Sequence, residues 1–190
     1  MEYQKVIDAK KYLCRFDQIL SQMANKMIHA DIINNITIDF IQCMIPHHQA
    51  AIYMCENLLE YTNYQPLQKI AKNIINTQTK GIEQMKYIKR DTQCFSNCES
   101  DVDCYINKYL LITKNMISKM KNSPRCLDIN LNFINEMIPH HEGAIAMCEN
   151  LLKYCINPRL KNVAESIINE QSQGVRQLKE IQKDLCKLKK

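Results

Sequence analysis

Two short runs in this chain of 190 residues carry imidazole and thioether side chains in the same order. Both read Met-Ile-Pro-His-His, at residues 44–48 and 137–141, and a Met-Cys pair follows each of them. Neutral imidazole and thioether sulfur are soft ligands, which favour Cu(I) or Ag(I) over hard ions such as Mg²⁺ or Ca²⁺. The candidate metal ligands are Met44, His47, His48, Met54 and Cys55 in the first of these two His-Met cassettes, and Met137, His140, His141, Met147 and Cys148 in the second.

A helix would bring the members of each cassette onto one stripe. At about 100° per residue, His48 and Cys55 fall on one side of Met44 while His47 and Met54 fall on the other, all on the face that must be turned to the interior. A methionine stripe alone usually fills a core. Two adjacent histidines, repeated with their sulfur neighbours, instead favour a metal site. Further sulfur could come from methionine pairs spaced i,i+4 upstream of each cassette, although core packing is the commoner role for Met23, Met27, Met116 and Met120.

The chain is an internal duplication with an offset of 93 residues. We divide it into a first repeat (1–93), a linker (94–100) and a second repeat (101–190). Every histidine except His29 has a twin in the other half, whereas only Cys55 and Cys148 pair among the ten cysteines. A fixed disulfide framework would have been copied with the repeat, so we expect free thiols or local bridges. The linker run from Cys94 to Cys104 lacks the Cys-x2-Cys spacing of zinc sites.

Three glycines, no tryptophan and long 3.6-residue periodicity predict an all-α fold with three helices per half. The expected ranges are 3–29, 36–62, 66–91, 101–121, 128–155 and 158–186. Asn35 or Thr37 could cap the second helix, and the pair Asn157-Pro158 is typical of a helix start. Pro46 and Pro139 predict a kink or a new helix start just before each histidine pair.

Short connections favour antiparallel neighbours, so we expect the second and third helices of each half to form a four-helix core with the first helices packed against it. The cassettes lie at the midpoints of their helices. The two histidine pairs should then face each other within about 20 Å, one or two helix diameters. Ligating histidines also need an acceptor for the other ring nitrogen. The candidates kept in both halves are Glu56, Glu149, Gln78 and Gln171.

Composition narrows the classes of function. A net charge of +5 without an extended basic block gives little support for nucleic-acid binding, and no apolar run approaches the roughly 20 residues of a membrane span. The first residues lack an apolar signal core, so we expect a cytoplasmic protein with reduced thiols. The oligomeric state stays open.

Enzyme classes fit the residues poorly. A di-iron oxidase needs paired Glu-x-x-His motifs, a covalent haem needs Cys-x-x-Cys-His, and a cysteine hydrolase needs an acidic partner for its histidine. None is present at the expected spacing. We therefore expect no catalytic activity. A non-covalent haem binder and a structural or interaction bundle whose His-Met stripe is core remain as alternatives.

The residues around the histidine pairs resemble the bacterial family called domain of unknown function 305. The resemblance covers nearly the whole chain, its His-His motif is specific, and residues 133–178 repeat the pattern of the first half. That pattern consists of Phe40, Met44, Pro46, His47, His48, Ala51 and Met54, followed by Leu67, Ala71, Ile74, Ile75, Gln78, Ile82 and Met85.

The resemblance implies a helical, ferritin-like bundle that binds metal, above all copper. The family includes copper-binding proteins of copper homeostasis, often exported. The resemblance implies four metal ligands in each half. They are Met44, His47, His48 and Met54 in the first half and Met137, His140, His141 and Met147 in the second. The family usually has a glutamate where this chain has Gly81 and Gly174, and its loss weakens any hard-metal site. Together with the missing signal segment, this predicts an intracellular Cu(I) buffer.

Overall fold

The computed structural model describes residues 2–92 and 96–187, and all regular structure within them is α-helical. The helices are α1 (Glu2–Ile28), α2 (Ile36–Leu59), α3 (Gln65–Asp91), α4 (Glu99–Lys121), α5 (Ile129–Leu151) and α6 (Pro158–Lys187). The all-α prediction is confirmed. α2 ends before residue 62 because the N–H groups of Tyr61 and Thr62 both bond back to the Leu58 carbonyl and the chain turns there. Cys94 of the predicted linker lies outside the described residues.

Capping side chains mark where the helices begin. The Asn35 side chain accepts a hydrogen bond from the Ile38 N–H, and its twin Asp128 accepts from Asn130 and Leu131 at the start of α5. The Asn157 side chain accepts from the Arg159 N–H, just before Pro158 opens α6. Such caps satisfy N–H groups that have no partner inside the helix. The cap predicted before Pro158 is confirmed, and Asn35 rather than Thr37 caps α2.

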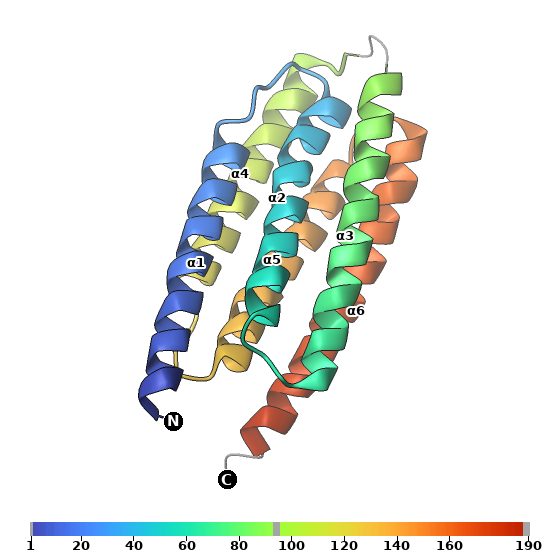
Figure 1. Cartoon of the computed structure of the whole chain (residues 1–190). Helices are drawn as coiled ribbons and strands as arrows, with labels where there is room; N and C mark the ends of the chain where they lie inside the picture. Colours follow the sequence, from blue (N-terminus) through green and yellow to red (C-terminus); the bar gives the residue numbers. More distant parts are fainter. Residues whose placement is uncertain (1, 93–95, 188–190) are drawn as a thin grey trace.

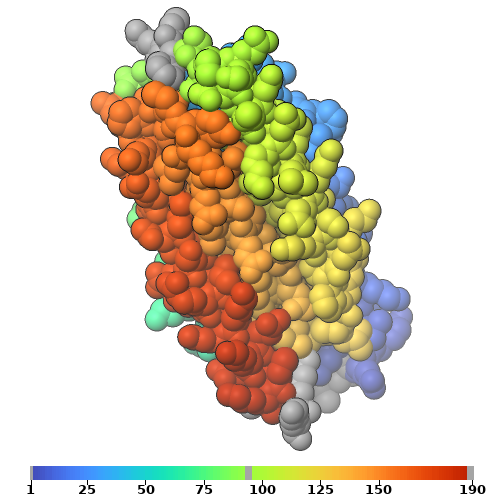
Figure 2. Space-filling model, turned by 180° about the vertical axis from the view of Figure 1, so that it is seen from behind, coloured from blue at the N-terminus to red at the C-terminus, as the bar shows by residue number. Residues whose placement is uncertain are grey.

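The six helices form three layers of two antiparallel helices (Figure 1). α2 and α5 form the central layer, α1 and α4 cover one of its faces, and α3 and α6 cover the other. Figure 2 shows α4, α5 and α6 side by side on the far face of the molecule. A helix covered on several sides must be apolar around most of its circumference. The predicted four-helix core is therefore confirmed, and its two central helices are those that carry the cassettes.

Matching hydrogen bonds show the pseudo-twofold relation of the halves. The Asn57 side-chain amide donates to the Tyr12 carbonyl at 3.1 Å, and its twin Asn150 donates to the Tyr105 carbonyl at 3.1 Å. Each bond ties a central helix to the outer helix that precedes it. The axis passes between α2 and α5, so equivalent residues of the two halves face each other there.

Both internal prolines lie within continuous helices. Proline cannot donate to the carbonyl four residues earlier. For Pro139 that carbonyl belongs to Asn135, and the Ser123 hydroxyl donates to it at 3.1 Å. The helix continues through the proline, and the Ser123 hydroxyl, which lies equally close to the Lys119 carbonyl, is within hydrogen-bond distance of the freed carbonyl. Within the described residues, no helix is long and apolar enough to cross a membrane.

Candidate metal site

His47 and His140 meet at the pseudo-twofold axis. Their rings stack with centroids 3.7 Å apart and an interplanar angle of 29°. Nε2 of His47 lies 3.3 Å from the His140 carbonyl oxygen, and Nε2 of His140 lies 3.2 Å from the His47 carbonyl oxygen. The prediction that the histidine pairs face each other within about 20 Å is confirmed.

This reciprocal pairing fixes which ring nitrogen carries the proton. A carbonyl oxygen can only accept, so Nε2 is the donor in both rings and Nδ1 holds the free lone pair. Both Nδ1 atoms are buried and have no hydrogen-bond partner. A metal-ligating histidine characteristically donates its other N–H to an acceptor that sets the ring orientation. His47 and His140 have this arrangement, with each supplying the acceptor for the other.

His48 and His141 point the opposite way, toward α3 and α6. A Cβ built at Gly81 would lie 3.0 Å from Cδ2 of His48, and one built at Gly174 would lie 2.6 Å from Cδ2 of His141. Only glycine leaves room for rings this close to the outer helices. Each ring centroid lies 6.0 Å from that of the preceding histidine, and each Nδ1 is again buried without a partner.

Burial keeps all four imidazoles neutral. The side chains are at most 2% exposed. Desolvation, together with neighbouring histidines, lowers the pKa of His48 to about 3 and the pKa values of His47 and His141 well below the ordinary value. Desolvation also lowers the pKa of His140 to about 4. Neutral imidazole is the form that binds metal, so these rings need lose no proton first.

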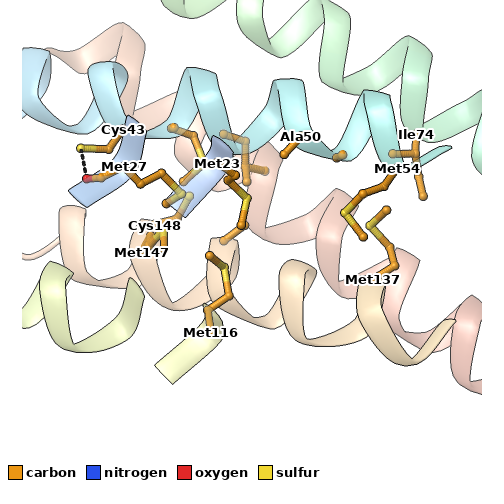
Figure 3. Packing of buried hydrophobic residues seen from close by; sticks show 14 of the residues in the cluster. Met23, Met27, Cys43, Ala50, Met54, Ile74, Met116, Met137, Met147 and Cys148 are labelled. Carbon is orange, nitrogen blue, oxygen red and sulfur yellow. Dashed lines mark hydrogen bonds between the residues drawn. The ribbon is translucent and has the colours of Figure 1, made fainter. Parts of the chain in front are cut away.

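The thioether side chains of the cassettes lie on α2 and α5, the helices that carry the histidines. Met44, Met54, Met137 and Met147 are at most 1% exposed. Figure 3 shows Met54 of α2 and Met137 of α5 pointing toward one another. The pseudo-twofold relation puts Met147 and Met44 in the corresponding places, so sulfur is found along the interface of α2 and α5.

The outer methionines reach the central layer from α1 and α4. Met23, Met27, Met116 and Met120 are all buried in the core. Met116 packs so closely on α5 that a Cβ built at Gly143 would lie 2.3 Å from its sulfur (Figure 3). Their placement fits core packing, and their role as additional ligands stays a prediction.

The two cysteines of the cassettes are fully buried. Cys55 acts electrostatically on the Tyr12 hydroxyl, and Cys148 acts on the Tyr105 hydroxyl. Burial raises the pKa of both thiols far above the ordinary value, so both are protonated. Within the described residues, no group of three His, Cys, Asp or Glu side chains could hold a metal ion. The assignment of Cys55 and Cys148 as ligands stays a prediction.

None of the predicted side-chain acceptors orients a histidine ring in the described structure. Glu56 and Glu149 lie exposed on the surface. Gln78 and Gln171 are buried and line one cavity with His141, but their Oε1 atoms have no partner. Backbone carbonyls orient the central rings instead, which the sequence could not indicate because every residue has one.

A buried carboxyl group on α5 escaped the sequence reasoning. Glu136 is 1% exposed and accepts a hydrogen bond of 2.7 Å from the Tyr12 hydroxyl. Desolvation raises the pKa of Glu136 to about 8, although the Tyr12 bond and Arg125 lower it. Its twin is Cys43, whose thiol donates to the Met27 carbonyl at 4.0 Å (Figure 3). A charged residue on the apolar face of a predicted helix was the available signal.

Acid is expected to destabilise the fold as the pH falls from 6.5 to about 5. The four buried histidines have folded pKa values below the ordinary 6.5. Below that pH the unfolded chain binds more protons, so the unfolding free energy falls by up to about 1.4 kcal/mol per pH unit for each histidine. Glu136, with its raised pKa, offsets one of the four. Urea unfolding at several pH values measures the slope, and a flat profile would contradict the burial of neutral rings.

Solved structures show the same fold. The structure "CopM in the Ag-bound form (by soaking)" matches with a TM-score of 0.58 and 27% identity, covering 80% of this chain and 98% of that one. "CopM in the Cu(II)-bound form" matches with a TM-score of 0.58 and 25% identity, covering 78% and 97%. A DUF305 fragment from Deinococcus radiodurans, 19% identical, has a TM-score of 0.56 over 78% and 96% of the two chains and supports the fold alone. Curated proteins gave no match.

The sequence pattern of one protein family matches both halves. The family is described as "Domain of unknown function (DUF305)", and the matched segments are residues 16–89 and 111–182. They contain both His-Met cassettes and follow the offset of the duplication. The chain therefore belongs to the DUF305 family, with two tandem copies of its domain.

Proposed function

We propose that this protein binds copper as Cu(I) through its two His-Met cassettes and acts as a copper buffer. The observation that carries the proposal is the set of four buried imidazoles, each neutral and each with a partnerless Nδ1 atom. Thioethers on the same two helices complete a soft, uncharged ligand set. The similarity to CopM, solved with Ag and with Cu(II), supports copper as the metal.

The absence of charge in this ligand set favours a monovalent ion. The cost of moving an ion into a medium of low polarity rises with the square of its charge, so a divalent ion pays roughly four times the desolvation penalty of Cu(I). Imidazole and thioether groups cannot neutralise that charge, and the Glu136 carboxyl next to Met137 holds its proton at neutral pH. Cu(II) and Zn²⁺ should therefore bind less well than Cu(I).

The number and type of available ligands also favour Cu(I) over Zn²⁺. Zinc sites use three or four ligands from His, Cys, Asp and Glu. Within the described residues no such group of three exists. A complete coordination shell would have to include methionine sulfur, which soft monovalent ions accept and Zn²⁺ avoids. The exposed cysteines fit a reducing compartment, in which their thiols would stay free.

The haem alternative receives no support from the cavity that reaches His141. That cavity contacts His141 and has a volume of about 50 Å³, room for an ion or a water molecule or two. A haem would need the helices to separate. The structural alternative explains the stacked rings but not four buried Nδ1 atoms without partners, because buried polar atoms normally have hydrogen bonds.

Competition between metals tests the proposal. The reduced protein, with its exposed cysteines changed to serine, is titrated with Cu(I) against a chelator of known affinity and separately with Zn²⁺. We expect Cu(I) to bind more tightly by at least about a hundredfold, as expected of soft ligands. Equal affinities, or tighter binding of Zn²⁺, would contradict the assignment. The serine changes remove thiols that would bind Cu(I) independently of the cassettes.

A further inference from the structure

A polar cleft between α3 and α6 leads from the surface to one of the buried histidines. Its volume is about 50 Å³, and its rim includes the exposed side chains of Asn73 and Glu170. The floor is formed by Gln78, Gln171 and His141, all at most 3% exposed. We call it the α3–α6 cleft. It joins the surface to a side chain that is otherwise sealed inside the protein.

The two glutamines on the floor are twins, 93 residues apart. Their Oε1 atoms are buried and have no hydrogen-bond partner in the protein. A buried carbonyl oxygen without a partner is unfavourable, and groups of this kind call for an explanation such as a bound ion or water. Two of them beside one cavity indicate that the cavity receives a polar or charged guest.

Gly174 opens the cleft to His141. Any side chain there would lie between α6 and the imidazole ring, because even a Cβ would come within 2.7 Å of Nε2 of His141. The ring edge is therefore exposed to the cleft and not to a side chain of α6. On the opposite face of the central layer, side chains of α1 and α4 pack against α2 and α5, and they include Met23, Met27 and Met116.

We propose that the α3–α6 cleft is the route by which the metal ion reaches the histidines, with Gln78 and Gln171 as transfer ligands. This inference rests on the proposed function. Glu170 attracts a cation at the rim. The amide oxygens replace part of its water shell, and because a soft ion prefers imidazole nitrogen to amide oxygen they release it to His141. The cleft thus controls how fast metal enters and leaves.

Stopped-flow loading tests the route. Cu(I) is supplied from a weak chelator to the reduced protein with its exposed cysteines changed to serine. Thr77→Phe fills the half-buried cleft wall with an aromatic ring. We expect the association and dissociation rates to fall together by about tenfold or more, with the Kd unchanged. The matched control is Gln84→Phe, at an exposed position of α3 outside the cleft, which should load at the parent rate.

A second variant separates transfer from binding. Gln78→Leu with Gln171→Leu keeps the side-chain size and removes both oxygens, and it should slow both rates without changing the Kd. A weaker Kd at an unchanged association rate would make the glutamines permanent ligands and overturn the proposal. Unchanged rates in both variants would also overturn it. If the parent protein bound no Cu(I) at all, the proposed function itself would fail, a result distinct from loss of the route.

Discussion

Cu(I) affinity is expected to fall by at least about a hundredfold when His47, His48, His140 and His141 are all replaced with alanine. Loss of residues that only orient a ligand already costs ten- to a hundredfold in metal affinity, and loss of the ligands costs more. The measurement is chelator competition with the reduced protein, in the background with the exposed cysteines changed to serine. Circular dichroism confirms that the helices remain.

The matched control is His29→Ala. His29 is exposed and has no twin in the other half, so its removal should leave the affinity unchanged. Where the alanine variant does not fold, glutamine at the same four positions keeps a polar side chain of similar reach but offers no imidazole. If either folded variant retained the parent affinity for Cu(I), the histidines would be core residues and the site would lie elsewhere.

Gly174→Ala is expected to destabilise the fold by up to about 2 kcal/mol, because overpacking usually costs about 1–3 kcal/mol and alanine returns about 1 kcal/mol to a helix. The new Cβ would lie 2.6 Å from Cδ2 of His141, a ring confined between α5 and α6. Displacement of the ring should also weaken Cu(I) binding. Urea unfolding at neutral pH measures the change.

Gly81 provides a graded control. Gly81→Ala should cost less than Gly174→Ala, because the corresponding distance to His48 is 3.0 Å. A Gly174→Ala protein as stable as the Gly81→Ala protein would contradict the tight contact with His141.

The duplication made the centre of the fold predictable. Two equal halves with short connections and cassettes at helix midpoints place α2 against α5, and the histidines meet there as expected. The helical wheel could not show that His47 and His48 serve different interfaces. Adjacent residues diverge by about 100°, so one ring points at the axis and the other at α3. Which neighbour lies on each side depends on how the layers are stacked.

The sequence could not predict the surroundings of side chains whose neighbours come from other helices. Cys55 shares the predicted stripe with His48, yet about two turns of helix separate the two residues. Cys55 instead acts electrostatically on Tyr12 of α1. Glu136 keeps its proton because the fold buries it, while the Tyr12 hydroxyl, 124 positions away in the chain, donates a hydrogen bond that partly opposes this effect. Long-range contacts of this kind follow from the tertiary fold and leave no local signature.

The reciprocal bonds between His47 and His140 have an evolutionary consequence. Because each ring takes its acceptor from the opposite half, a single repeat could build this centre only by associating with a copy of itself. The chain has the form of an isologous homodimer whose protomers became covalently fused. Fusion ended the requirement that both protomers be identical, and the core shows the result, with a carboxyl group at Glu136 and a thiol at its counterpart Cys43.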